Sequence, residues 1–172
     1  MAADGVDHAQ LYSTDLDPDF IELGFELFGD RDRFPPGAFV AADMLAPDDA
    51  GAATLDGKVT LVHASNFFHL FSREQQVQAA VRITRFLKPG TTDAVIFGGQ
   101  LGSLEPGGMK SAQSGNTLYG HDPQSLQTLW DEVGELTGTR WRVEAEFLGK
   151  LSFSIPGLPE NVQYLKFAIY QV

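Results

Sequence analysis

The stretch at residues 61–90, "LVHASNFFHLFSREQQVQAAVRITRFLKPG", decides the expected fold because a strand in it leads directly into a long helix. The β-branched run at 59–62 is typical of a buried strand. After an aromatic patch, apolar residues recur at helical spacing, Ser72 can cap the helix start, and Pro89-Gly90 can end it. A strand followed by such a helix is typical of α/β proteins.

The same alternation continues on the amino-terminal side of this stretch. Residues 21–28 predict a helix that Asp17-Pro18 opens and that is buried on most of its faces. The run "AFVAAD" predicts a short buried strand that ends at Asp43, and residues 44–58 predict a loop with one helical turn.

On the carboxyl-terminal side, residues 94–97 predict a strand that enters the glycine run at 98–103, which we expect to be a turn with positive backbone angles. Residues 122–138 predict an amphipathic helix with Asp122 as its N-cap. Two alternating segments at 140–153 and 163–172 predict strands that pair antiparallel. Together these elements predict one α/β domain over residues 1–172, with a mostly parallel sheet flanked by helices and an antiparallel carboxyl-terminal strand pair.

The composition of the chain excludes several classes of binding partner and of chemistry. The formal charge of -11 and the pI near 4.6 argue against nucleic acid and anionic membranes as partners, since both need a basic face. The chain has no cysteine, which excludes disulfides and thiolate chemistry. No apolar run approaches the roughly 18 residues of a membrane helix, and the polar residues 1–10 do not form an ordinary secretion signal, so we expect a cytoplasmic protein.

The polar residues that could carry chemistry cluster after the predicted strand at 59–62 and in the glycine run. No histidine spacing suits a metal, so no metal site is expected, and Ser65 lacks the flanking glycines of a nucleophile elbow. The catalytic candidates are His63, Asn66, His69 and Gln100, and the substrate-binding candidates are Phe67, Phe68, Phe71, Tyr119, His121 and Trp130. The alternative for the aromatic residues is the hydrophobic core, and for the histidines it is a hydrogen-bonded position beneath the aromatic patch.

Four segments together resemble the class I S-adenosylmethionine-dependent methyltransferases, particularly those of fungal natural-product pathways. They are "YSTDLDPDFIELGFELF", "FVAADML", "LVHASNFFHLFSREQQVQAAVRITRFLKPG" and "LWDEVGELTGTRWRVE", and they span most of the chain in family order. The resemblance implies that Asp15 binds the cofactor ribose, that Asp43 contacts adenine and that Met44 flanks the adenine ring. The alternative role for Asp15 and Asp17 is capping of the helix that follows.

The sequence departs from this family at its start. The family's first strand and its glycine-rich loop should precede Tyr12, yet residues 1–10 contain only Gly5. In the family that strand is central, between the second and the fourth. We therefore expect those two neighbours to pair directly, or a strand from another subunit to fill the gap, and we expect a homodimer.

Three functions follow from this pattern. The first is a methyltransferase-like enzyme that needs no cofactor and catalyses a cyclisation, isomerisation or pericyclic step on a hydrophobic small molecule. The second is an S-adenosylmethionine-dependent methyltransferase whose cofactor site is completed by a second subunit. The third is a non-catalytic partner of a full-length methyltransferase. The missing loop favours the first function over the second.

Overall fold

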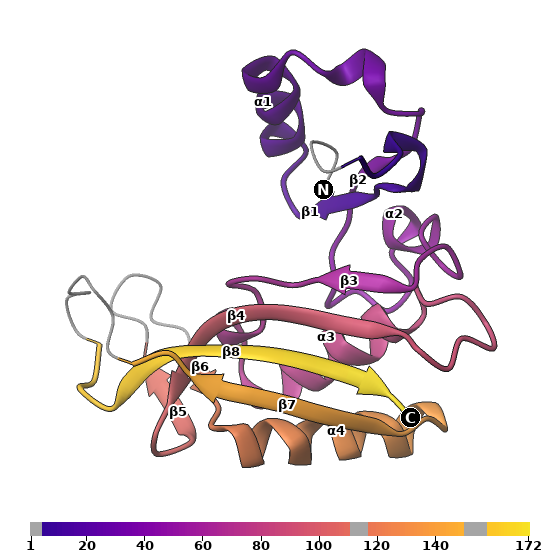
Figure 1. Ribbon diagram of the computed structural model, residues 1–172. Helices are drawn as coiled ribbons and strands as arrows, with labels where there is room; N and C mark the ends of the chain where they lie inside the picture. Colours follow the sequence, from indigo (N-terminus) through magenta and orange to yellow (C-terminus); the bar gives the residue numbers. More distant parts are fainter. Residues whose placement is uncertain (1–4, 111–116, 150–157) are drawn as a thin grey trace.

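A computed structural model describes residues 5–110, 117–149 and 158–172 of the chain (Figure 1). The described strands form a parallel pair, a four-stranded sheet and a hairpin. The pair is β1 (Ser13–Asp15) with β2 (Phe39–Ala41), the sheet has the order β3 (Leu61–His63), β4 (Val95–Ser103), β8 (Val162–Gln171) and β7 (Trp141–Phe147), and the hairpin is β5 (Gly107–Lys110) with β6 (Thr117–Gly120). The predicted α/β class and the antiparallel carboxyl-terminal strand pair are confirmed.

The strands that precede β5 run in one direction. β1 is parallel to β2 and β3 is parallel to β4, whereas β8 is antiparallel to both of its neighbours. The arrows of β1, β3 and β4 point to the same side in Figure 1, so their carboxyl ends share one side of the molecule. Within the described residues β1 does not pair with β3, so the direct pairing offered as one possibility from the sequence is wrong. Among the strands that the structure describes, none pairs with the second edge of β1 or of β3.

The helices lie close to where the sequence predicts them. They are α1 (Pro18–Phe28), the single turn α2 (Ala50–Ala53), α3 (Arg73–Thr84) and α4 (Pro123–Thr137), and the short 3-10 turn η4 (Phe68–Leu70) precedes α3. Ser72 and Asp122 cap α3 and α4 through reciprocal capping boxes, which satisfy amides that the first turn leaves free. α3 ends at Thr84, ahead of the predicted stop at Pro89-Gly90.

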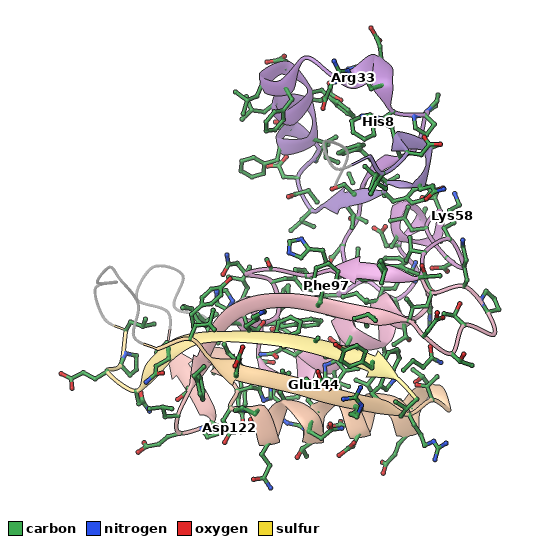
Figure 2. All side chains as sticks on the ribbon, in the orientation of Figure 1. His8, Arg33, Lys58, Phe97, Asp122 and Glu144 are labelled. Carbon is green, nitrogen blue, oxygen red and sulfur yellow. The ribbon has the colours of Figure 1, made fainter. Side chains whose placement is uncertain are left out.

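α3 and α4 cover one face of the four-stranded sheet. Trp130 of α4 is fully buried and packs against Trp141 of β7, with ring centroids 5.0 Å apart. Ile96 of β4 is fully buried on the same side. Because side chains alternate along a strand, Phe97 and Glu144 point to the opposite face, where they line a shallow cavity of about 650 Å³ (Figure 2).

The burial predicted for α1 is wrong. None of its residues is buried, and Phe20, Leu23, Leu27 and Phe28 are 56–74% exposed. Phe25 packs against Phe39 of β2, with ring centroids 4.8 Å apart. The described contacts of α1 are made mainly with the narrow β1–β2 pair, and two short strands cannot cover an apolar helix on all sides.

The glycine run at 98–103 is not a turn but the part of β4 that continues to its end at Ser103. Neither Gly98 nor Gly102 has a left-handed φ. A Cβ atom on Gly98 would lie 2.3 Å from the Ala64 carbonyl oxygen, and one on Gly102 would lie 2.5 Å from the His121 carbonyl oxygen. These glycines therefore serve close backbone approach, a role that the local sequence does not distinguish from a turn.

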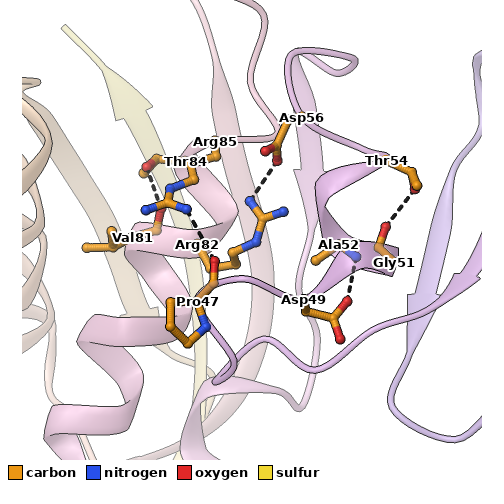
Figure 3. A network of polar contacts seen from close by, with 10 residues as sticks. All are labelled: Pro47, Asp49, Gly51, Ala52, Thr54, Asp56, Val81, Arg82, Thr84 and Arg85. Carbon is orange, nitrogen blue, oxygen red and sulfur yellow. Dashed lines mark hydrogen bonds and ion pairs between the residues drawn. The ribbon is translucent and has the colours of Figure 1, made fainter.

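Two arginines of the α3 region fasten the segment that follows β2 (Figure 3). Arg82, whose side chain is 3% exposed, forms an ion pair with Asp56 at 2.6 Å, and its guanidinium carbon lies 4.8 Å from the centre of the Phe86 ring. Arg85, directly after α3, donates a hydrogen bond from Nη1 to the Pro47 carbonyl oxygen at 3.3 Å. The loop that leaves β2 is thus tied to the helical layer.

Candidate functional site

Two acidic residues lie at the carboxyl edge of the β1–β2 pair. Asp15 is the last residue of β1 and stands opposite Ala41, the last residue of β2, while Asp43 follows two residues later. In open α/β sheets, ligands bind beyond such carboxyl ends. The two aspartates predicted to bind the nucleoside therefore lie at one edge, as expected from their order in the chain.

Both carboxylates keep capacity to accept further hydrogen bonds. Oδ1 of Asp15 accepts from the Asp17 amide at 3.0 Å, and Oδ1 of Asp43 accepts from the Leu45 amide at 2.8 Å. The N-cap of α1 is Asp17, not Asp15. A carboxylate has about four lone-pair positions, so one amide leaves room for a hydroxyl pair or an amine.

Met44 lies deeper than this edge. Its side chain is 8% exposed, and it lines a cavity of about 240 Å³ together with Val77 and Val81 of α3. A separate cavity of about 170 Å³ beneath α1 includes Asp15 among its lining residues. Contact of Met44 with an adenine ring stays a prediction.

A second polar group lies where the chain leaves β3. Nε2 of His63 and Oγ of Ser65 are 2.9 Å apart, and the His63 ring centroid is 5.1 Å from that of Phe97. Asn66 has a left-handed φ of 52°, which asparagine tolerates better than most residues. Its backbone amide donates to the Gly99 carbonyl oxygen at 2.7 Å. This turn rests on the glycines of β4 and leaves His63, Ser65 and Asn66 exposed.

The other two catalytic candidates are buried. Gln100 is fully buried and His69 is 8% exposed; neither side-chain nitrogen or oxygen of Gln100, nor Nδ1 of His69, has a hydrogen-bond partner in the described part of the chain. Buried polar atoms of this kind are commonly satisfied by internal water. The structure thus separates the four candidates into an exposed pair, His63 and Asn66, and a buried pair.

His121 belongs with the buried polar residues. It is fully buried, its Nδ1 lies 2.9 Å from Oγ of Ser125, and its Nε2 has no partner among the residues described. Burial lowers the pKa of His121 to about 4; the charge of Arg73 lowers it further and that of Asp122 raises it. Burial also lowers the pKa of His69 to about 4, so both imidazoles are neutral at pH 7.

The predicted substrate-binding aromatics divide in the same way. Phe68 and Trp130 are core residues, at 2% and 0% exposure, whereas Phe67, Phe71 and Tyr119 are half-buried. The ring centroids of Phe67 and Phe71 are 5.1 Å apart, and those of Tyr119 and His121 are 4.7 Å apart. Their contact with a substrate stays a prediction.

Gln76 is a residue that the sequence analysis missed. It is fully buried on α3, and its Nε2 donates to the carbonyl oxygens of Tyr119, at 2.9 Å, and Phe71, at 3.2 Å. It therefore joins β6 to the turn that precedes α3. The available signal was a polar residue three and four positions before Ala79 and Ala80, on the helix face that becomes buried.

No cluster of three or more histidine or acidic side chains that could hold a metal occurs among the described residues. Of the helices within residues 5–110, 117–149 and 158–172, none is both long and apolar enough to cross a membrane.

Known proteins with similar sequences are fungal methyltransferases. No protein-family model matches the chain. It is 37% identical over 174 residues to O-methyltransferase atr3 of Stereocaulon alpinum, a match that covers 100% of this chain and 49% of the relative. It is 35% identical over 141 residues to methyltransferase trt5 of Aspergillus terreus, which covers 82% of this chain and 50% of that protein. The chain spans about half the length of these curated relatives.

Solved structures with a similar fold include both methyltransferases and a cyclase. The 1,6-didemethyltoxoflavin-N1-methyltransferase of Burkholderia thailandensis, solved with S-adenosylhomocysteine, matches 93% of this chain and 60% of that chain at 15% identity and a TM-score of 0.58. The cyclase SpnF matches 93% of this chain and 66% of its own at 11% identity and a TM-score of 0.59. Identities this low show a shared fold alone.

Proposed function

Because this chain belongs to the class I S-adenosylmethionine-dependent methyltransferase family, we propose that it forms the nucleoside-binding side of a methyltransferase that acts on a hydrophobic small molecule. One observation carries the proposal: Asp15 and Asp43 lie at the same carboxyl edge of two parallel strands, and each accepts a local amide through one carboxylate oxygen. This arrangement favours S-adenosylmethionine-dependent methyl transfer, the second of the three functions predicted from the sequence, over the cofactor-free reaction.

The described residues fit one half of S-adenosylmethionine. Asp15 would accept hydrogen bonds from the ribose hydroxyls, and Asp43 would accept one from the exocyclic amine of adenine. For the methionine half, no glycine-rich loop follows a strand ahead of β1 within the described residues. We expect another polypeptide segment to supply that wall.

When bound, the cofactor supplies an electrophilic methyl group. This chain contributes the polar residues at the carboxyl end of β3. There the exposed imidazole of His63 can take the proton of the substrate hydroxyl that is to be methylated, and Ser65 orients the ring through a 2.9 Å contact. Asn66 can donate to a carbonyl of the substrate, and the open rings of Phe67 and Phe71 can pack against its apolar scaffold. The buried residues His69, Gln100 and His121 would support this region from behind.

Isothermal titration of the purified chain with S-adenosylhomocysteine tests the proposal. Two charge-assisted hydrogen bonds contribute about 3–6 kcal/mol, so we expect saturable binding with Kd on the order of millimolar to tens of micromolar. Asp15→Asn should abolish the heat. Asp19→Asn is the matched control, because it makes the same charge change in the first turn of α1, away from the strand end. Equal heats from both variants would contradict the proposal.

A cofactor-free cyclisation, isomerisation or pericyclic step remains the second candidate. The fold shared with SpnF favours it, although that likeness extends to the fold alone. A folded chain that binds no S-adenosylhomocysteine, alone or with a completing segment, yet accelerates ring closure of a hydrophobic substrate would support this function over methyl transfer.

A further inference from the structure

We propose that Gln76 is a positioning residue for the substrate, because its side-chain amide holds Phe71 and Tyr119 together in one aromatic wall. This wall consists of the half-buried rings of Phe67, Phe71 and Tyr119. The inference rests on the proposed function, since it assigns the wall to the substrate side of the same site. Gln76 itself is fully buried, so it acts through the residues that it holds.

Three hydrogen bonds meet where β6 contacts the turn that precedes α3. Nε2 of Gln76 donates to the Tyr119 carbonyl oxygen at 2.9 Å and to the Phe71 carbonyl oxygen at 3.2 Å. A side-chain amide nitrogen carries two hydrogens, so one group can serve both acceptors. The backbone amide of Tyr119 also donates to the Phe71 carbonyl oxygen, at 3.0 Å. Gln76 thus joins two segments that are far apart in the chain.

The orientation of the Gln76 amide follows from its surroundings. Both hydrogen-bond partners of its nitrogen are carbonyl oxygens, which can only accept hydrogen bonds. A rotated amide would place Oε1 against two acceptors, so the nitrogen must face them. An apolar side chain of similar length at this position would leave the Tyr119 carbonyl oxygen without this donor.

Each residue that the amide holds also packs against a second ring. The ring centroids of Phe71 and Phe67 are 5.1 Å apart with an interplanar angle of 72°, and those of Tyr119 and His121 are 4.7 Å apart. Edge-to-face contacts of this kind favour particular ring positions. A backbone contact that is fixed on both sides therefore sets where the two ring pairs stand relative to each other. Loss of the Gln76 amide would change that spacing without removing any ring.

Stability alone is a poor explanation for an amide at this position. The residues Val77, Ala79 and Ala80 beside it on α3 are buried and apolar. Oε1 of Gln76 has no hydrogen-bond partner in the part of the chain that the structure describes. Because an unpaired buried oxygen destabilises a fold, it offsets part of what the two donated hydrogen bonds contribute. The distinctive effect of Gln76 is the geometry that it imposes on the wall.

The test compares Gln76→Met with Gln78→Met in the absence of cofactor. Methionine keeps an unbranched side chain and removes the amide. Gln78 is the matched control because it lies two residues later on the exposed side of the same helix. The probe is 1-naphthalenemethanol, a neutral hydrophobic alcohol, titrated at a temperature where both variants and the unaltered chain are folded. We expect Gln76→Met to bind it about tenfold more weakly than the unaltered chain, and Gln78→Met to stay within about twofold.

The carbonyl carbon resonances of Phe71 and Tyr119 report on the contact itself. Loss of a hydrogen-bond donor shifts the resonance of the accepting carbonyl group, so both signals should move in Gln76→Met and neither in Gln78→Met. A role confined to stability would lower the free energy of unfolding but leave the affinity of the folded protein for the probe unchanged. That result would overturn the proposal, as would equal weakening in the two variants.

A second measurement decides the matter if Gln76→Met does not fold. In the unaltered chain, we expect nuclear Overhauser effects from the naphthyl protons to the ring protons of Phe71 and Tyr119. Binding of the probe at another surface, or no binding, would overturn the proposal. Because the assay contains no cofactor, its failure leaves the S-adenosylhomocysteine titration with Asp15→Asn to decide the proposed function separately.

Discussion

Removal of the charge on Asp56 should destabilise the chain, because the guanidinium of Arg82 would lose its carboxylate partner in a buried position. Arg82 is 3% exposed, and its Nε has no hydrogen-bond partner among the described residues, so the ion pair at 2.6 Å is its main charge compensation. Asp56→Asn keeps the shape of the side chain and removes only the charge. The affected structure is the tie between α3 and the residues that follow α2, where Asp56 lies (Figure 3).

The expected magnitude follows from burial. Breaking a fully buried ion pair costs about 3–5 kcal/mol, but Asp56 is 42% exposed, so water compensates part of the loss and we expect about 1–2 kcal/mol. Glu144→Gln is the matched control: it makes the same change in the Arg142–Glu144 pair, whose side chains are 54% and 56% exposed. There we expect a loss of at most about 0.5 kcal/mol.

Urea unfolding followed by tryptophan fluorescence measures both variants, since Trp130 and Trp141 are buried in the core. We expect a clearly lower free energy of unfolding for Asp56→Asn than for Glu144→Gln. If Asp56→Asn lost no more stability than Glu144→Gln, burial of Arg82 would not govern the energy of this contact.

Two further predictions concern backbone approach and pH. Gly98→Ala should destabilise the chain by several kcal/mol or prevent folding, because its Cβ would lie 2.3 Å from a backbone oxygen, whereas Gly24→Ala in α1 meets nothing within 4 Å and should stabilise the helix by about 0.5–1 kcal/mol; similar melting temperatures for the two variants would contradict this. Burial holds the pKa of His69 and His121 near 4, below the unfolded value near 6.5, so the unfolded chain binds more protons between these pH values. The contribution of these two neutral imidazoles to the free energy of unfolding is therefore complete above about pH 6.5. It is lost as the pH falls toward 4, by up to about 1.4 kcal/mol per pH unit for each histidine. Unfolding measured from pH 7 to 5 should show this slope, and the double variant His69→Gln, His121→Gln should flatten it; an unchanged slope would refute the assignment.

The elements that the sequence predicts well depend on local signals. Ser72 and Asp122 begin their helices where predicted, because a capping side chain acts on amides within three residues of itself. The strand that ends near Asp43 is likewise defined by a short apolar run and its polar end. Such signals need no knowledge of what packs against the element.

The elements that the sequence predicts poorly depend on distant partners. The exposed face of α1 reflects which elements lie beside it, and the role of Gly98 depends on Ala64, more than thirty positions earlier in the chain. The β5–β6 hairpin was not predicted, and residues 111–116 between its strands lie outside the described part. The segment at 150–153 of the strand predicted at 140–153 also lies outside it.

The residues of the candidate site also divide into those placed by local signals and those placed by distant packing partners. Asp15 and Asp43 could be placed at one edge from chain order alone, since each follows a parallel strand. His63 and His69 lie six positions apart, yet the η4 turn directs His69 into the interior and leaves His63 exposed. Sequence spacing does not reveal such a reversal, because η4 packs against β6 from much later in the chain.

A heteronuclear NMR titration of the labelled 18.7 kDa chain with S-adenosylhomocysteine would locate the nucleoside on the protein residue by residue. We expect saturable shifts of the backbone amides of residues 15–17 and 42–45, around Asp15 and Asp43, and we expect these shifts to be lost in Asp15→Asn. Amides of α4 should not move. Shifts confined to other regions, or no shifts from a chain that unfolds cooperatively, would contradict the assignment of this edge to the nucleoside.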